Sequence, residues 1–271
     1  MAPVITRHVR DGVALLGDDA RPGGVTFAFT ERTGGVSRPP YASLNLGSRC
    51  GDDAGSVAEN RRRALRALGA ADLASSLVEP RQVHGDRIVV VRGSADGRAT
   101  EEELARARAC AEEGADAIVC TATGVPVLLC FADCVPVVIC APGAFAVVHS
   151  GWRGTIARIS AKALGVLCHE AGCAATDVSV YVGPHITGAD YEVSPELLAR
   201  FVAELGPDVA VPDRPRHLSL GRAIARALAD AGVSAGQIAW VSESTASATE
   251  RFYSYRAEGG TCGRHAAIAY L

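Results

Sequence analysis

Two short apolar runs, Val135–Cys140 and Ala144–Val148, are the strongest secondary-structure signal in the chain. They are rich in β-branched and small apolar residues, and Ala141–Gly143 between them has the composition of a tight turn. We therefore predict two adjacent strands, joined by a hairpin or a short crossover. Either connection would bring Cys134, which precedes the first run, and His149, which follows the second, to one edge of a sheet.

Patterning elsewhere predicts further strands and helices. Strands are expected where short apolar runs are bounded by glycine, proline or polar residues, at Gly24–Thr30, Arg87–Val91, Asp116–Cys120, Val178–Val182, Ile238–Val241 and Ala266–Leu271. Helices are expected after capping residues, from Asp52 or Asp53 to Leu68, at Glu101–Glu113, from Gly154-Thr155 to Ala171, at Pro195–Leu205 and at Leu220–Ala231. Thr155 is the expected cap of the third helix, and Gly172 its expected stop. The elements do not follow a strict βαβ rhythm, so we predict one α/β (α+β) domain over residues 1–271, with a mixed sheet covered by helices.

Composition narrows the class of protein. With 48% apolar and 21% charged residues, the chain can bury a substantial core and disorder is not expected. A net charge of −3 without a basic block argues against a nucleic-acid partner. No apolar run reaches the ~20 residues needed to cross a bilayer, and the N-terminus lacks the apolar stretch of a secretory signal. Nine cysteines without a C-x-x-C pair favour reduced thiols, so we expect a cytoplasmic protein without membrane contact.

A third metal-competent side chain, His84, stands in the polar segment that precedes one of the predicted strands. One thiolate and two imidazoles have the ligand count of a catalytic zinc, because a fourth position remains open for water or substrate. Cys134 follows Asp133, an acidic residue that is costly beside an apolar run unless it is paired. After His149 come two glycines and Arg153, whose planar guanidinium can hold an anion. A lone histidine or cysteine beside a strand is nevertheless more often structural than catalytic, so these residues alone leave both interpretations open.

Two further segments have competing interpretations. Tyr41–Gly47 is either a surface loop in which Asn45 caps its own backbone or a ligand-binding loop. Arg61–Arg63 lies within a predicted helix, where a solvated face is favoured over a phosphate site because no glycine-rich loop accompanies the cluster.

A set of short motifs, in this order, makes the interpretation specific: Gln82–Gly85, Ala132–Pro136, His149–Gly154, Gly183–Ile186, Tyr191–Val193 and Phe252–Arg256. Thr33–Gly35, Tyr41–Gly47 and Glu59–Arg61 belong to the same pattern. Together they resemble the YfiH-like laccase-domain family of purine nucleoside phosphorylases, once labelled multicopper polyphenol oxidases. The resemblance covers nearly the whole chain.

The resemblance implies a single-domain α/β/α enzyme with zinc, or copper as the alternative metal, held by His84, Cys134 and His149. It implies phosphorolysis of adenosine, inosine, guanosine and methylthioadenosine, together with adenosine deamination. Purine nucleosides and phosphate are then the expected partners, and we expect a monomer. We expect Arg153 to hold phosphate, and the purine and ribose to contact Asn45, Gln82, Tyr191, Glu192 and Arg256.

Two positions depart from the family pattern. Ser244-Thr245 stands where the family often has Cys-Thr, and Asp190 stands where a cysteine is common. Neither touches the expected metal ligands, but both bear on substrate preference.

Three other functions compete with the phosphorylase. A multicopper polyphenol oxidase needs many imidazoles, usually in His-x-His pairs, and this chain has seven histidines and no such pair; a single blue-copper site does use two histidines and one cysteine. A cysteine hydrolase would use Cys134 as nucleophile and His149 as its base, and the sequence does not exclude it. A zinc-stabilised interaction module fits poorly with an open three-ligand site beside an arginine and glycines.

Overall fold

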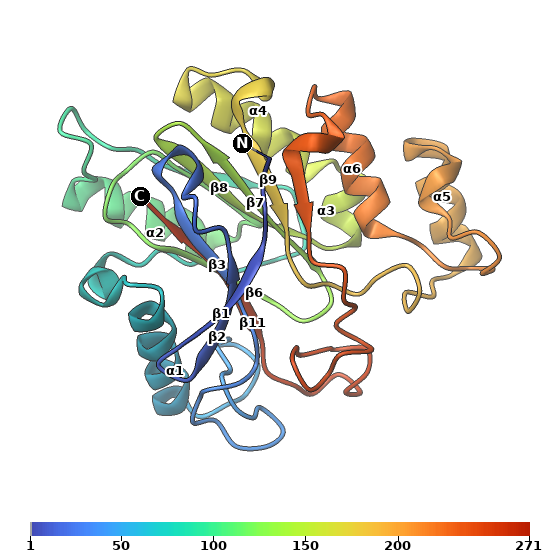
Figure 1. Cartoon of the computed structure of the whole chain (residues 1–271), viewed down its shortest axis with the longest axis horizontal. Helices are drawn as coiled ribbons and strands as arrows, with labels where there is room; N and C mark the ends of the chain where they lie inside the picture. The colour runs from blue at the N-terminus through green and yellow to red at the C-terminus, as the bar shows by residue number, and fades with distance from the viewer. Residues whose placement is uncertain (1) are drawn as a thin grey trace.

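The computed structural model describes residues 2–271 and contains two β-sheets with helices on their outer faces (Figure 1). One sheet is five-stranded and antiparallel throughout, in the order β1-β2-β3-β11-β6. The other is six-stranded, in the order β10-β9-β7-β8-β5-β4. It is mixed, because the two outermost pairs, β10 with β9 and β4 with β5, are parallel while the central pairs are antiparallel.

The strands are short and correspond to the apolar runs of the sequence. Those of the five-stranded sheet are β1 (Thr6–Arg10), β2 (Val13–Gly17), β3 (Thr26–Thr30), β11 (His265–Tyr270) and β6 (Val127–Phe131). Those of the six-stranded sheet are β10 (Ile238–Trp240), β9 (Ser179–Val182), β7 (Val135–Ala141), β8 (Ala144–Ser150), β5 (Ala117–Cys120) and β4 (Ile88–Val91).

Capping side chains set where several of the helices begin. The helices are α1 (Ala54–Ala67), α2 (Glu101–Glu113), α3 (Trp152–Ile156), α4 (Ile159–Ala171), α5 (Pro195–Leu205) and α6 (Leu220–Asp230). Of the two predicted caps of α1, Asp52 and Asp53, it is Asp53 that accepts a 2.8 Å hydrogen bond from the Ser56 amide. Thr100, Ser194 and Ser219 cap α2, α5 and α6 in the same way. Among residues 2–271, no helix has both the length and the apolarity needed to cross a membrane.

The main core lies between the two sheets. Phe27 and Phe29 of β3 face Phe145 of β8 and Tyr181 of β9, and the rings of Phe27 and Tyr181 are 4.4 Å apart between centroids. Helix α2 packs beside β4 and contributes apolar side chains to this same core. The outer face of the five-stranded sheet is covered by α1, and that of the six-stranded sheet by α4, α5 and α6, so helices enclose a pair of sheets (Figure 1).

The predicted α/β class is confirmed, and the predicted mixed sheet is the six-stranded one. The antiparallel sheet was not predicted. Its strand β1 is mostly exposed and polar, and the apolar run that forms β6 ends only a few residues before Cys134 without a distinct turn signal. All nine cysteines are free, and Cys120 and Cys140 are buried as small apolar side chains, as expected for reduced thiols.

The prediction of one helix from Gly154-Thr155 to Ala171 is wrong. The segment is divided into α3 and α4 at Arg158, whose φ of 59° is left-handed and interrupts the helical path. Thr155 lies inside α3 and does not cap it. Its hydroxyl instead contacts the hydroxyl of Ser150 at 2.8 Å and donates to the carbonyl of Gly151 at 2.9 Å. Gly172 does end α4 in a left-handed conformation, as predicted.

Candidate metal centre and its cavity

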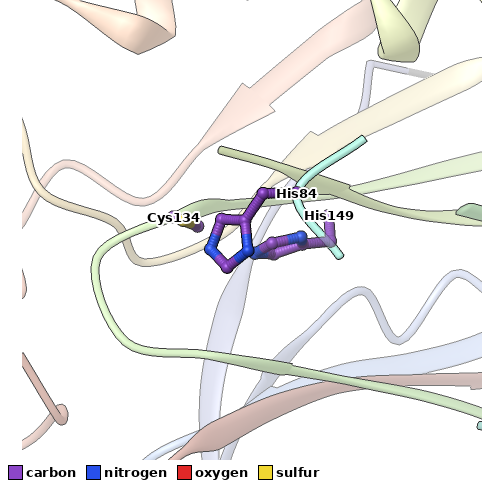
Figure 2. A group of neighbouring side chains, drawn as sticks. All are labelled: His84, Cys134 and His149. Atoms are coloured by element: carbon purple, nitrogen blue, oxygen red, sulfur yellow. The ribbon is translucent and has the colours of Figure 1, made fainter. Parts of the chain in front are cut away.

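The β7–β8 hairpin brings two of the three expected ligands together. Its register pairs Val135 with Ser150 and Pro136 with His149, so Cys134 reaches the end of the hairpin beside His149. His84 approaches from the loop before β4. The imidazole nitrogens and the sulfur of these three residues all lie within 4.8 Å of one another. Figure 2 shows the side chains converging from three separate segments.

Asp116, at the entrance to β5, fixes both histidines. Its Oδ1 accepts hydrogen bonds from the ring Nδ1 of His149 at 2.7 Å and from the backbone amide of His84 at 2.9 Å. Its Oδ2 accepts one from the backbone amide of Gly85 at 2.7 Å. The Asp116 side chain is fully buried. Because Nδ1 of His149 is bound to a carboxylate, Nε2 is the ring nitrogen available to a metal once its proton is lost. Sequence reasoning did not assign Asp116 a functional role; the only signal was an acidic residue opening an apolar strand.

The turn before β7 is held by a second carboxylate. Asp133 has a φ of 85°, an uncommon conformation for a residue other than glycine. Its carboxylate accepts hydrogen bonds from the hydroxyl of Thr245 at 2.7 Å and from the amide of Arg256 at 2.6 Å. The acidic residue beside the apolar run is therefore paired, as its cost required, and the pairing fixes the direction from which Cys134 enters the cluster.

Electrostatics in the cluster favour a thiolate. Burial raises the pKa of the Cys134 thiol, but His149 and His84 more than offset this and bring it to about 6. Burial lowers the pKa of His149, but Cys134 and Asp116 outweigh it and raise that pKa to about 9. Burial raises the pKa of Asp116, but the hydrogen bonds from His149 and from the neighbouring amides outweigh burial, so this pKa lies below its ordinary value. The group thus holds a buried negative charge on sulfur beside imidazole.

The donor set fits a zinc-type metal. One thiolate and two imidazoles are borderline-soft ligands, and three of them leave a coordination position free. Asp116 supplies the carboxylate partner that metal-ligating histidines usually have. Because a metal needs a thiolate and neutral imidazoles, its binding would displace a proton from the His149 imidazole. Over residues 2–271 this is the single cluster of three or more such side chains.

The cluster forms part of the wall of a cavity of about 720 Å³. This volume lies within the range of roughly 300–1,000 Å³ typical of small-molecule sites. Beside the cluster, the wall contains Tyr191, Arg256, Trp152 and Ile186. A second region of the wall, which we call the arginine wall, consists of Gly47, Ser48, Arg61, Glu79, Tyr255 and Arg264. Its members are joined by their own contacts, including the Arg61–Glu79 ion pair and the Tyr255 ring beneath Arg264.

Among the residues expected to contact substrate, Tyr191, Arg256 and Gln82 line the cavity. The guanidinium of Arg256 lies 5.3 Å above the ring of Tyr191, and burial raises the pKa of that phenol to about 12, so it stays protonated. The side-chain amide of Gln82 makes two hydrogen bonds to the backbone of Cys130. Its Nε2 donates to the Cys130 carbonyl at 2.7 Å, and its Oε1 accepts from the Cys130 amide at 2.8 Å. Gln82 therefore holds β6 in place at the cavity wall.

The structure does not bring the other three candidates into the cavity wall. Asn45 is fully buried, and its side chain binds the backbone amides of Gly47 and Arg264. The side chain of Glu192 points away from the cavity and forms an ion pair with Arg216 at the surface. Its backbone carbonyl accepts a hydrogen bond from Arg256. The exposed Arg153 stacks on Trp152 and borders a separate, smaller hollow, because its position in the first turn of α3 directs it toward Arg200 and Glu204 of α5.

Arg61, Glu79 and Arg264 line the cavity but were not selected from the sequence. The prediction that the Arg61–Arg63 cluster is a solvated face is wrong for Arg61, because its side chain is only 17% exposed and binds the carbonyl of Leu46 and the carboxylate of Glu79. Arg62 is 58% exposed, as expected. The signal for Arg61 was its place in the Glu59–Arg61 motif; Glu79 and Arg264 had none.

The two departures from the family pattern lie close together. Ser247 donates a 2.7 Å hydrogen bond to the carboxylate of Asp190, and the Ser244 hydroxyl accepts one from the amide of Thr187 at 3.2 Å. The neighbouring Thr245 binds Asp133 at 2.7 Å. These polar contacts connect the departures to the turn that carries Cys134, without replacing a ligand.

Comparison with known proteins identifies similar chains. The profile of the family described as multi-copper polyphenol oxidoreductase laccase matches residues 26–271. A purine nucleoside phosphorylase of Deinococcus radiodurans is 36% identical over 248 residues, covering 91% of this chain and 89% of its own. The purine nucleoside phosphorylase YfiH of Escherichia coli is 33% identical, covering 93% of this chain and 96% of its own.

Solved structures agree with these sequence matches. YlmD of Geobacillus stearothermophilus superposes with a TM-score of 0.83 at 30% identity, covering 99% of this chain and 98% of its own. A YfiH described as a hypothetical protein, from Bacillus licheniformis, superposes with a TM-score of 0.82 at 27% identity, covering 95% and 96% of the two chains. The fold built from two sheets is therefore common to this chain and these neighbours.

Proposed function

The chain belongs to the laccase-like, YfiH-like family, and from that premise we propose that it is a zinc-dependent purine nucleoside phosphorylase with adenosine deaminase activity. The observation that carries the proposal is the His84–Cys134–His149 cluster in the wall of a cavity of nucleoside size. Relatives covering more than nine-tenths of the chain are named purine nucleoside phosphorylases. Adenosine, inosine, guanosine and methylthioadenosine are the proposed substrates, and the cytoplasm the proposed compartment.

In this proposal His84, Cys134 and His149 hold the zinc. When bound, the ion supplies Lewis acidity at an open position. Asp116 keeps the proton of His149 on Nδ1 and fixes the ring, and it anchors the His84 backbone through its amide. Asp133 holds the turn that presents Cys134.

Tyr191 and Arg256 are the proposed nucleoside contacts. They offer a planar ring and a planar guanidinium beside the cluster, surfaces suited to stacking against a purine. In phosphorolysis, a phosphate oxygen forms a bond to C1′ of the ribose while the bond from C1′ to purine N9 breaks. The electron pair leaves with N9, and the proton of hydrogen phosphate ends on the purine. Deamination at C6 instead consumes water and releases ammonia, so the two reactions require different co-substrates in one cavity.

Products formed from adenosine at increasing phosphate concentration test whether the reactions share the cavity. A shared site predicts that phosphate raises adenine and ribose 1-phosphate at the expense of inosine. If inosine formation stays constant at saturating phosphate, with adenosine limiting, the reactions do not compete and the shared site is wrong. If the zinc-loaded protein forms no ribose 1-phosphate from any of the four nucleosides, the phosphorylase proposal itself is contradicted.

A cysteine hydrolase is the second candidate, because Cys134, His149 and Asp116 form a chain of the kind that activates a thiol nucleophile. Such an enzyme would retain its activity after chelation and lose it on alkylation of Cys134 by iodoacetamide. The proposed phosphorylase predicts the opposite effect of chelation. A multicopper oxidase needs several copper sites, and residues 2–271 contain one His/Cys cluster.

A further inference from the structure

We propose that the arginine wall is the phosphate site of the cavity and that Arg264 is its principal ligand. This inference rests on the proposed phosphorylase, which needs an anion site that the metal cluster and Tyr191 do not provide. Phosphate is best recognised by a guanidinium with free, coplanar N–H groups. The sequence pointed to Arg153 for this role, but Arg153 lies outside the cavity.

Arg264 is the arginine of this wall with unused binding capacity. It is half-buried, and within residues 2–271 no carboxylate lies close enough to form an ion pair with it. Its hydrogen bonds to protein come from one terminal nitrogen, which donates to the carbonyls of Cys262 at 2.7 Å and Gly263 at 2.9 Å. Nε and the other terminal nitrogen therefore keep their protons for a ligand in the cavity.

Arg61 has a different role in the same wall. Its Nε and one terminal nitrogen both donate to the carbonyl of Leu46, at 2.9 and 2.8 Å, and its other terminal nitrogen pairs with Glu79 at 2.5 Å. Its charge is thereby balanced within the protein. The uncompensated positive charge of the wall is that of Arg264, which is why we assign the anion to it.

The buried Asn45 explains how Arg264 is held. The side-chain Oδ1 of Asn45 accepts hydrogen bonds from the backbone amides of Arg264 at 2.8 Å and of Gly47 at 3.0 Å. The backbone amide of Leu46 also donates to the Arg264 carbonyl at 2.9 Å. A Cβ at position 47 would lie 2.7 Å from Cγ of Arg264, so only glycine allows the arginine stem to pack there. Asn45 is therefore a positioning residue that prepares the anion site, not a substrate contact.

Sheet register places this site near the metal cluster. In the β11–β6 pair His265 lies opposite Phe131, and Arg264 and Ala132 are the residues that adjoin this last pair of the two strands. Cys134 follows two residues later, a span of at most about 7 Å of chain. An anion on Arg264 and a group at the cluster therefore face the same cavity.

The same chemistry would recognise either inorganic phosphate or a phosphate carried by a nucleotide. We assign inorganic phosphate as co-substrate, because phosphorolysis requires it as a separate reactant. Adenosine 5′-monophosphate distinguishes the sources. If the protein cleaves this nucleotide without added phosphate, and Arg264 is needed for that cleavage, the co-substrate assignment is overturned.

The test uses zinc-loaded protein with Arg264→Gln, and Arg226→Gln as the matched control. Arg226 is 58% exposed on α6 and pairs only with Asp230 at the surface. Inorganic phosphate should raise the thermal midpoint of wild type and of the control but not that of Arg264→Gln. In the same variant the KM for phosphate should rise about 10- to 100-fold, while the KM for inosine and the deamination of adenosine stay near wild type.

Arg264→Lys provides a second variant that keeps the charge and the packing of the stem, should the glutamine variant not fold. It loses the two-pronged donor, so its phosphate KM should lie between those of wild type and Arg264→Gln. Wild-type phosphate affinity in a folded Arg264 variant overturns the assignment, as does selective loss of phosphate binding in Arg153→Gln instead. Failure of the proposed function is distinct: phosphate would still stabilise wild type through Arg264, while no nucleoside would be cleaved.

Discussion

At the scale of single residues, Asp116 is the side chain on which the candidate centre depends. It accepts hydrogen bonds from the ring of His149 and from the backbone around His84, so it joins two of the three ligand-bearing segments. A carboxylate without exposure can accept several donors at once, whereas an amide of the same shape also presents an NH2 group. The arrangement therefore requires the charge of Asp116 as well as its size.

Asp116→Asn should weaken zinc binding about 10- to 100-fold, because His149 loses the acceptor that fixes its ring. It should also lower the free energy of unfolding by about 1–3 kcal/mol, since a buried donor is left unsatisfied. Competition with a chromophoric chelator and urea denaturation measure the two effects. Asp86→Asn is the control, because Asp86 is 47% exposed and pairs with Lys162 at the surface. Wild-type zinc affinity in Asp116→Asn would show that the carboxylate is dispensable.

His265 gives a residue-scale prediction about acid stability. It is fully buried beside Phe131 and Phe252, and burial lowers its pKa to about 3 from an ordinary value of 6.5, the Pro184 carbonyl offsetting only part of the effect. Between pH 6.5 and 3 the unfolded chain therefore binds a proton at His265 that the folded chain does not bind. The contribution of His265 to the free energy of unfolding is fully present above pH 6.5 and is lost as the pH drops from 6.5 toward 3. His265→Phe should flatten this fall in a plot of thermal midpoint against pH. An unchanged slope would mean that other groups cause the acid sensitivity.

At the scale of elements, the junction between β8 and α3 forms one side of the metal cluster. Gly151 lies there, between His149 and the first turn of α3. A Cβ at this position would lie 3.0 Å from Cδ2 of His84 and 3.1 Å from the sulfur of Cys134. The close approach of backbone to ligands, and not an unusual backbone angle, is what requires glycine, since its φ is −74°.

Gly151→Ala should displace both ligands by a few tenths of an ångström and weaken zinc binding about tenfold, comparable with the loss of a supporting contact. Gly165→Ala is the matched control, because a Cβ at that exposed position in α4 meets nothing within 4 Å. The control should retain zinc affinity and gain about 0.5–1 kcal/mol of stability from helix propensity. Equal zinc affinity in the two variants would contradict the close packing of the junction.

The same scale shows what local sequence can predict. The strands β7 and β8 and the approximate start of α1 followed from apolar runs, turn residues and a capping aspartate, although the sequence left a hairpin and a short crossover open between the two strands. The break at the left-handed Arg158 did not follow from the sequence, and neither did the use of the Thr155 hydroxyl, which contacts Ser150 and Gly151 instead of capping a helix. Competition among nearby acceptors for one hydroxyl is settled by the folded geometry, which composition and periodicity do not contain.

At the scale of the whole molecule, the cavity is assembled from distant segments. The amide of Arg264 binds Asn45, which is 219 residues earlier, and Arg61 joins the same wall through Leu46. No spacing in the sequence reveals such a contact, because it depends on β11 pairing between β3 and β6. The three ligands stood out because their motifs were distinctive, whereas the residues that hold them and the arginine wall emerged only from the packing of the two sheets.

The central claim is that a zinc held by His84, Cys134 and His149 is required for phosphorolysis. The most direct test strips wild type with a chelator, titrates zinc back, and measures ribose 1-phosphate formed from inosine, with Cys134→Ala and Cys110→Ala alongside. Cys110 is a half-buried thiol of α2 outside the cluster. We predict that the rate rises with bound zinc and saturates at about one zinc per chain in wild type and Cys110→Ala, and stays at background in Cys134→Ala. Full phosphorolysis by metal-free protein, whether wild type or Cys134→Ala, would contradict the account.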